Sequence, residues 1–212
     1  MPIVKSAPYH IQAYELIKGM ILSGEIKCGE RINEIKLSQE MQISRSPIRE
    51  AIRILEQDGL IVSTSNSHIV NPLDRNTLQD VYECRIGLES YAARLAVKNF
   101  TKEDYDKLVQ SVEDCKIADR NDDLIALIDL NTFFHSYIVS LTKNEYIISE
   151  MERIRNIVTL SRIKEVQDGE RDLSYAYSDH LEIAKKMLEG DEDSVEHFMR
   201  KHISNNLSKL IL

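Results

Sequence analysis

Three regularly spaced arginines lie in the first third of the chain. Arg45, Arg49 and Arg53 are four residues apart, between positions 44 and 59. At about 100° per residue they share one face of a helix, and roughly 125° around it lies an apolar face. Arginine carries a planar fork of donors that binds guanine edges or phosphate oxygens. One face of this segment can therefore pack, and the other can contact nucleic acid. The apolar face contains Ile48, Ala51, Ile52 and Leu55.

Metal-binding side chains occur in the second half of the chain. Asn131 and His135 are four residues apart, so on a helix they lie one turn apart and can converge on one ion. His180 and His202 follow on later helical segments. Neutral imidazoles with one oxygen ligand suit zinc, nickel, iron or manganese better than calcium or magnesium. The amide oxygen of Asn131 has no formal charge, which lowers the affinity expected for the ion.

Arg85 interrupts an apolar helical stripe. A buried charge is costly unless it is paired, so the position needs an explanation. One interpretation is an ion pair with Glu89, one turn further on. The other is an arginine directed into a cavity, where it binds the carboxylate of a small organic acid. The remaining members of the stripe are Leu78, Val81, Leu88, Ala92 and Leu95.

The segment around the three arginines is predicted to be the third helix of a small unit. Ser44 or Ser46 can cap it, Pro47 is tolerated in its first turn, and Gly59 can end it in the left-handed conformation. A helix of about 15 residues ending at Gly24 and a short helix over 34–42 precede it. A two-stranded wing over 60–64 and 68–71 follows, with a polar tip at 65–67. This order is typical of a winged helix-turn-helix over residues 1–72.

From residue 73 to 212 the hydrophobic period is helical throughout. Six helices are predicted, and their apolar stripes favour an antiparallel bundle of six to seven helices. The fold class is therefore mainly α. The predicted ranges are 74–98, 102–119, 122–142, 144–166, 171–189 and 191–210.

Charge and cysteine content limit the classes of function. The net charge is −8, with 8 basic and 8 acidic side chains in residues 1–72 and 19 basic and 27 acidic ones in the rest. Attraction to DNA must therefore come from a local cluster. Three widely spaced cysteines suggest neither a disulfide framework nor a thiolate zinc site. We expect a cytoplasmic protein with no membrane segment.

The N-terminal part resembles the winged helix-turn-helix of GntR-family transcriptional regulators. The similarity rests on three short motifs: Gly29-Glu-Arg31, Ile43-Ser-Arg-Ser-Pro-Ile-Arg-Glu-Ala51 and Leu55-Glu-x-Asp-Gly-Leu60. The second part is similar to the helical FCD-type effector domain of the FadR subgroup. That similarity rests on Val81-Tyr-Glu-x-Arg85-x-x-Leu-Glu89, Phe134-His135, Asp179-His180 and Gly190-Asp191.

Two departures from the family pattern bear on function. The wing tip usually carries glycine, and Asn66 stands there; asparagine is the next most tolerant residue at positive φ, so we expect the wing to persist. The effector domain often has aspartate four residues before the histidine of the Phe-His pair, and here that residue is Asn131. The second change weakens the expected metal site.

The resemblance implies a set of site residues. DNA contacts are expected from Ser44, Arg45, Ser46, Arg49 and Asn66. A divalent transition metal is expected on Asn131, His135, His180 and His202, with Arg85 binding the effector. His197 should face away from this site.

The resemblance predicts a DNA-binding regulator of transcription rather than an enzyme. We expect a homodimeric repressor that binds double-stranded operator DNA and responds to a small organic acid bound in the 73–212 domain. Two alternatives remain at this point. The metal itself can be the signal, or a three-histidine metal with an open position can activate water for hydrolysis.

Overall fold

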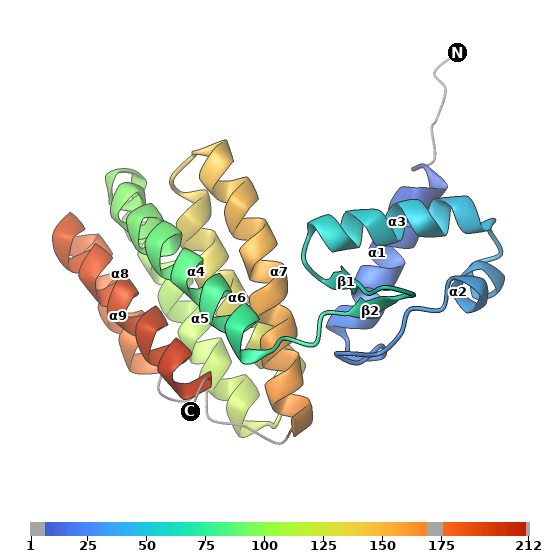
Figure 1. The fold of residues 1–212 in the computed structure, drawn as a ribbon. Coiled ribbons are helices and arrows are strands. Elements are labelled where there is room, and N and C mark those ends of the chain that lie inside the picture. The colour runs from blue at the N-terminus through green and yellow to red at the C-terminus, as the bar shows by residue number, and fades with distance from the viewer. Residues whose placement is uncertain (1–6, 169–175, 211–212) are drawn as a thin grey trace, which may run out of the picture. The chain divides into compact units, whose positions relative to one another are not determined.

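The computed structural model describes residues 7–168 and 176–210. In those ranges the chain forms α-helices and one two-stranded sheet, which confirms the mainly α prediction. The contacts within the chain separate it into two compact units. The boundary lies between Leu73 and Asp74, one residue beyond the predicted one. Figure 1 draws the first unit in blue and cyan and the second in green to red. None of the helices in the described ranges has the length and apolar character that crossing a membrane requires.

The first unit packs two long helices against a short helix and a β-hairpin. Its core combines Ile17 and Ile21 of the first helix with Ile48, Ile52 and Leu55 of the third, all almost fully buried. The apolar face predicted for residues 48–55 is therefore the packed face. The elements are α1 (Tyr9–Leu22), α2 (Glu34–Glu40), α3 (Arg45–Gln57), β1 (Ile61–Ser63) and β2 (His68–Val70).

Local hydrogen bonds and turn residues set the ends of α2 and α3. Asn33 caps α2, because its Oδ1 accepts hydrogen bonds from two backbone N–H groups, those of Ile35 and Lys36. Gln42, at φ 54°, makes the turn into α3. Gly59, at φ 76°, ends the segment in the left-handed region, as predicted.

The wing is a short antiparallel hairpin in which Ile61 pairs with Val70 and Ser63 with His68. An isolated β-bridge between Arg31 and Ile69 joins strand β2 to the loop before α2. The wing persists with Asn66 in place of the usual glycine, as expected, although Asn66 is not at positive φ. The Thr64 hydroxyl accepts a hydrogen bond from the Ser67 backbone N–H and lies 2.8 Å from the Ser67 carbonyl oxygen.

The second unit contains six α-helices within the described residues, as predicted. The first of these helices, predicted over 74–98, ends at Ala96, and a 3₁₀ turn over Val97–Asn99 continues it. The predicted start of the fifth helix, at residue 171, lies outside the described residues. The helices are α4 (Arg75–Ala96), α5 (Lys102–Arg120), α6 (Leu124–Ser140), α7 (Glu145–Asp168), α8 (Ala176–Glu189) and α9 (Glu192–Leu210).

Side-chain caps start the helices of this unit. Asp74 caps α4 and Asp123 caps α6. Thr101 and Asp104 form a reciprocal capping box at α5. Helix starts are therefore encoded locally, and this explains why the predicted boundaries lie close to the observed ones.

Helix α4 is the central element of the bundle. It contacts α9, α7 and α6, while α5 packs on α6 and α8. Figure 1 shows α4 and α9 side by side along most of their length. The core they enclose contains Tyr82, Phe134, Ile183, Met199 and Ile203. Helix α6 and the later helices α8 and α9 thereby direct side chains into one interior.

Candidate functional site

The first candidate site is the exposed face of α3. Arg45 Nη2 lies 3.0 Å and Arg49 Nε 2.8 Å from the same oxygen of Glu34, on α2. The two arginine side chains are 49% and 61% exposed, against 19% for Glu34. The hydrogen bond from Arg49, assisted by Arg45, holds the pKa of the Glu34 carboxyl below its ordinary value, although burial opposes this. Both arginines are therefore accessible to a partner while anchored to the neighbouring helix.

The N-terminus of α3 is open. Ser44 occupies the cap position, but its hydroxyl makes no capping hydrogen bond, which corrects the predicted cap by either serine. Ser44 and Ser46 are both exposed. The first backbone N–H groups and the positive end of the helix dipole therefore face outward, an arrangement suited to phosphate oxygens.

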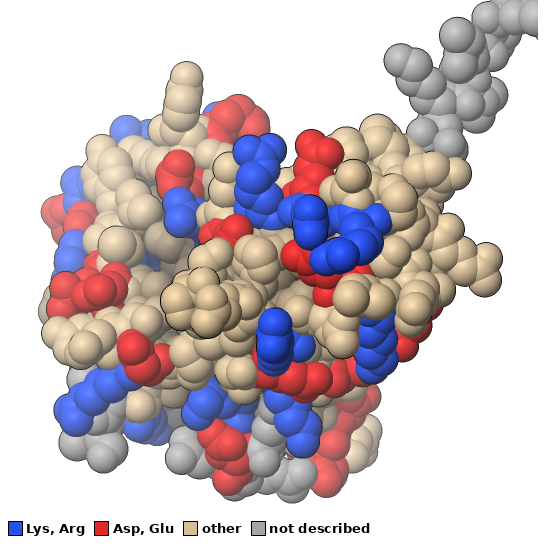
Figure 2. All heavy atoms as spheres, turned by 45° about the vertical axis from the view of Figure 1, so that its right-hand side comes forward, with Lys and Arg blue, Asp and Glu red and all other residues tan. Residues whose placement is uncertain are grey.

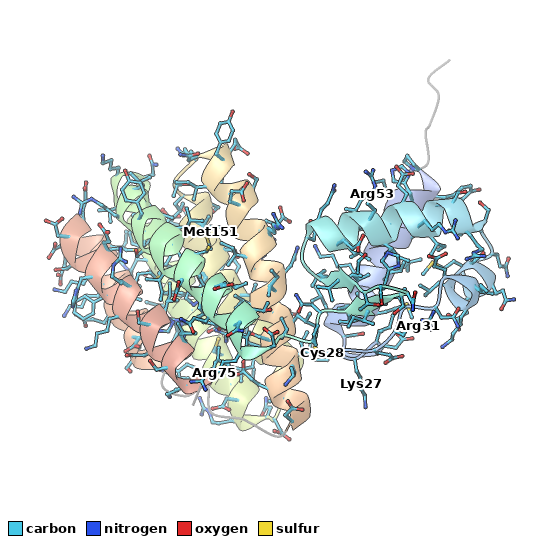
Figure 3. All side chains as sticks on the ribbon, in the orientation of Figure 1. Lys27, Cys28, Arg31, Arg53, Arg75 and Met151 are labelled. Atoms are coloured by element: carbon cyan, nitrogen blue, oxygen red, sulfur yellow. The ribbon has the colours of Figure 1, made fainter. Side chains whose placement is uncertain are left out.

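A polar groove of about 810 Å³ lies between the start of α3 and the wing. Arg45 and Asn66, both predicted DNA contacts, line it together with Arg31 and His68. Figure 3 shows Arg31 next to the hairpin, and Arg53 away from it on the outer side of α3. Arg31 is a basic residue that the sequence reasoning did not select, although it belongs to the Gly-Glu-Arg motif that carried the resemblance.

Basic and acidic side chains are mixed on the surface that Figure 2 presents. Blue and red groups alternate there and form no single basic field, as the near-neutral charge of residues 1–72 predicts. Attraction to DNA in this unit therefore depends on a few placed arginines.

The second candidate site is a buried cluster of three histidines. His135 on α6, His180 on α8 and His202 on α9 each offer a ring nitrogen, and these nitrogens all lie within 4.8 Å of one another. The three residues are between 1% and 7% exposed. His197, also on α9, is exposed and lies outside the cluster. The bundle thus brings together the three histidines that sequence spacing alone could not connect.

Carboxylates orient two of the rings. His135 Nδ1 contacts Glu89, and His202 Nδ1 lies 3.1 Å from Asp179 Oδ2. Each ring therefore presents Nε2 to the cluster centre, and His180 Nε2 lies 3.2 Å from His202 Nε2. His135 Nε2 is buried with no hydrogen-bond partner among the described residues. Carboxylates that hold histidines in this way are the usual outer shell of a metal site.

Burial favours the neutral form of all three imidazoles. Burial lowers the pKa of His135 to about 3, and the charge of Arg85 contributes, while Glu89 opposes the shift. Burial also lowers the pKa of His180 and of His202, in the second case against the pull of Asp179. A neutral ring that donates from Nδ1 keeps a lone pair on Nε2, which is the form that binds a metal. The donor set therefore fits a divalent transition metal.

Asn131, predicted as the fourth ligand, is buried next to His135, but its oxygen has another partner. In the amide orientation that satisfies its hydrogen bonds, Oδ1 accepts from Arg162 Nη1 at 3.0 Å and Nη2 at 3.1 Å. A second amide lies at the cluster on α9: Asn206 Nδ2 is 3.3 Å from His202 Nε2, and its buried Oδ1 has no partner in the described ranges. The role of Asn131 as a ligand stays a prediction.

Arg85 combines the two interpretations left open by the sequence. It is 3% exposed, and its Nε donates to Glu89 Oε2 at 2.7 Å. Its Nη1 has no hydrogen-bond partner among the described residues. The same side chain lines a cavity of about 70 Å³ that reaches the cluster at His135. Arg85 is therefore ion-paired with Glu89 and also part of the cavity lining.

Arg162, which the sequence patterns did not single out, also lines this cavity. Arg162 is 4% exposed and lies four residues after Val158, so it occupies the buried face of α7. A cation on the apolar face of a helix was the signal available, the same one that identified Arg85. Met151 lines the cavity from α7 and packs against Ala92 and Val139, and Figure 3 labels it.

Comparisons with known proteins match both units to known domains. Residues 10–69 match the model of the bacterial regulatory proteins of the gntR family, and residues 80–205 match the FCD domain. The chain belongs to the GntR family and carries an FCD domain. It is thus a DNA-binding transcriptional regulator and not an enzyme, which removes the hydrolase alternative.

Individual relatives extend over nearly the whole chain. YdhC of Bacillus subtilis, an uncharacterized HTH-type transcriptional regulator, is 29% identical over 97% of this chain and 92% of its own length. The Nta operon transcriptional regulator of Aminobacter aminovorans is 30% identical over 91% of this chain and 90% of its own length. Several further relatives are named as repressors. The structure of Escherichia coli McbR/YncC shares the fold, with a TM-score of 0.81 at 19% identity over 97% of this chain and 98% of its own.

Proposed function

We propose that this regulator is a homodimeric repressor whose hold on operator DNA is controlled by a small carboxylate in the helical unit. Residues 1–72 supply the DNA-binding domain, and residues 73–212 supply effector binding and dimerisation. Several relatives are named as repressors, which supports repression rather than activation by this protein. Binding of two half-sites by a symmetric dimer fits the winged helix-turn-helix of each subunit.

The observation that carries the DNA-binding proposal is the shared anchor of Arg45 and Arg49 on Glu34. Arginines held at one carboxylate, beside an open helix N-terminus and the groove lined by Asn66, form one compact donor surface. Phosphate oxygens meet the open end of α3 with Ser44 and Ser46, while the guanidinium groups reach base edges. Phosphate contacts fix the register, and base contacts give sequence specificity.

The metal proposal rests on the buried and unpartnered Nε2 of His135, together with the carboxylates behind His135 and His202. His135, His180 and His202 would hold zinc, nickel, iron or manganese, and an amide oxygen of Asn131 or Asn206 is the candidate fourth ligand. When bound, the ion would supply a Lewis acid able to attract an effector carboxylate. Glu89 and Asp179 fix the ring orientation in either state.

The cavity beside the cluster favours an effector over a metal-only signal. It is lined by Arg85, whose Nη1 is unpartnered within the described residues, and by Arg162. Both guanidinium groups can donate to a carboxylate in a site that excludes bulk water. A protein that senses only the metal has no use for two buried donors next to it.

The DNA-binding part is tested by titrating the protein against the DNA upstream of its own gene in a gel shift. We expect Arg45→Ala and Arg49→Ala each to weaken specific binding by about 1–3 kcal/mol, roughly ten- to a hundredfold. Arg53→Ala is the matched control on the same helix. Unchanged affinity in the first two variants, or an equal loss in the control, would remove this assignment.

The effector part is tested by thermal unfolding against a panel of small carboxylic acids, with and without Zn²⁺ or Ni²⁺. Stabilisation by an acid supports the effector, and release of DNA by that acid supports repression. Stabilisation by metal alone, with DNA release by metal alone, would replace the effector by a metal signal. The oligomeric state, from light scattering of the same samples, tests the homodimer.

A further inference from the structure

One large apolar side chain is exposed in the polar groove between the start of α3 and the wing. Ile35, in the first turn of α2, lines this groove with Arg45 and Asn66, and it is 54% exposed. A lone exposed apolar side chain is ordinary on a protein surface, so the place of Ile35 has to carry the argument. The other large apolar side chains that are exposed in the described part of this unit all lie on α1: Tyr9, Ile11 and Leu16.

Local hydrogen bonds fix the turn that carries Ile35. Its backbone N–H donates to Asn33 Oδ1 at 3.1 Å, as part of the cap of α2. Glu34, the preceding residue, accepts hydrogen bonds from two arginines of α3. Ile32 donates its backbone N–H to the His68 carbonyl of β2 at 2.9 Å. The turn is therefore tied to both elements that border the groove.

The groove around Ile35 is lined by groups that form hydrogen bonds. Apart from Ile35 and the buried Ile32, every lining residue has a polar or charged side chain. Such groups suit phosphate oxygens and the polar atoms of base edges. The alkyl group of Ile35 has no donor or acceptor for either. Ile35 therefore offers a different kind of contact from that of its neighbours.

Duplex DNA presents one apolar feature that matches this contact. The C5-methyl group of thymine lies on the major-groove edge of its base pair, and apolar side chains recognise it by contact. The N-terminal residues of a recognition helix contact base edges in the same groove. Because Glu34 ties the turn of Ile35 to Arg45 and Arg49, this alkyl group lies beside the end of α3 that reaches those edges.

We propose that Ile35 determines operator specificity by contact with the C5-methyl group of a thymine. The contact adds sequence information to that of the arginines, because a guanidinium group recognises hydrogen-bond acceptors and not a methyl group. Removal of the methyl group should weaken binding about three- to fivefold, the effect of losing the burial of one methyl-sized group. The proposal rests on the proposed function, because it needs the groove beside Arg45 to face DNA.

The test starts from a binding sequence that the full chain selects out of a random duplex library. Each thymine of that sequence is replaced in turn by deoxyuridine, which lacks only the methyl group and keeps every hydrogen-bonding atom. Affinities are measured by fluorescence anisotropy. We expect at least one thymine whose replacement weakens binding about three- to fivefold.

Two variants assign that thymine to a side chain. Ile35→Ala shortens an exposed side chain and favours the helix, so it should fold like the original protein, which circular dichroism checks. We expect this variant to bind the thymine and deoxyuridine duplexes equally well at that position. Leu16→Ala is the matched control, since Leu16 is 57% exposed on α1 and lies outside the groove. It should keep the full three- to fivefold difference. The comparison is a double-mutant cycle between side chain and methyl group.

Three results would overturn the proposal. In the first, every deoxyuridine substitution has the same effect on the original protein and on Ile35→Ala. In the second, Ile35→Ala weakens binding to all duplexes by one factor, which indicates a contact with the DNA backbone. In the third, Ile35→Ala changes the oligomeric state and leaves the thymine preference unchanged, which indicates contact with a second copy of the chain.

Failure of the proposed function gives a different result. Unchanged operator affinity in Arg45→Ala would show that the groove does not face DNA, and it would remove the proposed DNA contacts together with this inference. A normal loss in Arg45→Ala, with no methyl group coupled to Ile35, would remove this inference alone.

Discussion

The regulator holds the arginines of its two candidate sites in two opposite ways. Arg45 and Arg49 are exposed and share Glu34, so water surrounds the pairs and each pair contributes little net stability. Arg85 and Arg162 are at most 4% exposed, and their charges are screened by neither water nor salt. An exposed arginine can exchange its carboxylate for a phosphate at low cost. A buried one responds strongly to any change of charge beside it.

The contrast separates the two tasks of such a protein. A DNA-binding surface needs donors that are placed and yet replaceable, because DNA must displace their resting partners. A sensing cavity needs charges that a ligand alone can balance, because the free energy of ligand binding must change the state of the domain. The two units use the same residue type for these tasks and differ in its exposure.

The largest effect expected is on the buried ion pair. Glu89→Ala leaves Arg85 buried without its carboxylate and releases His135, so we expect about 3–5 kcal/mol lower stability of the helical unit. Urea unfolding followed by circular dichroism measures this. The exposed pair Glu103 and Lys107 on α5 is the control, and Glu103→Ala should cost at most about 1 kcal/mol. Equal losses of stability in the two variants would contradict the difference between buried and exposed ion pairs.

Metal removal should come next in size. At a free Ni²⁺ concentration of about 100 times the dissociation constant, the ion should stabilise the fold by about 2.7 kcal/mol. Chelation should therefore lower the melting temperature, and His202→Ala should abolish the difference between loaded and chelated protein. His197→Ala, on the same helix and exposed, should keep it. Loss of the difference in both variants would place the ion elsewhere.

A backbone test compares two glycines of the DNA-binding unit, each with open space where the methyl group of an alanine would lie. Gly29 has φ 77°, so Gly29→Ala should destabilise this unit by about 1–2 kcal/mol. Gly19 lies inside α1, so Gly19→Ala should stabilise it by roughly 0.5–1 kcal/mol. Opposite signs in thermal unfolding are the expected result. The same sign for both would show that crowding rather than backbone conformation controls this unit.

The smallest effect concerns the anchor of the two arginines proposed to contact DNA. Glu34→Gln keeps the shape of the side chain but removes the charge shared by Arg45 and Arg49. We expect specific binding to weaken relative to binding of unrelated DNA, by about two- to fivefold, which corresponds to a surface ion pair. Fluorescence anisotropy with the operator and with a scrambled duplex measures the ratio. Glu40→Gln on the same helix, whose carboxylate pairs with Lys36, is the control.

Local signals explain how much of the fold the sequence predicted. Asp74, Thr101 and Asp123 start helices by hydrogen bonds within a few residues, and Gly59 and Gly190 end them at positive φ. Such signals need no tertiary contact, so the six helices of the second unit and the order of elements in the first were predicted close to their observed bounds. The wing tip was predicted less well, because Thr64 and Ser67 hold it by hydrogen bonds that composition does not specify.

The candidate sites, too, were predicted where the signal lies within one helix and not where it depends on contacts between helices. Arg45, Arg49 and the apolar face of α3 follow from periodicity on a single helix, so the sequence alone determined which side packs and which side is free. Their partner Glu34 belongs to another helix, and only the fold decided that one carboxylate holds both. In the bundle, the sequence supplied His135, His180 and His202, and the resemblance to a family grouped them.

Only the tertiary structure decided how the buried charges are matched. It placed Glu89 against both Arg85 and His135, directed Arg162 to the oxygen of Asn131, and made both arginines line one cavity. The physical reason is that helical period and capping act over a few residues, whereas charge compensation depends on distances between α4, α6 and α7. Those distances are set by packing, which no single segment of the sequence encodes.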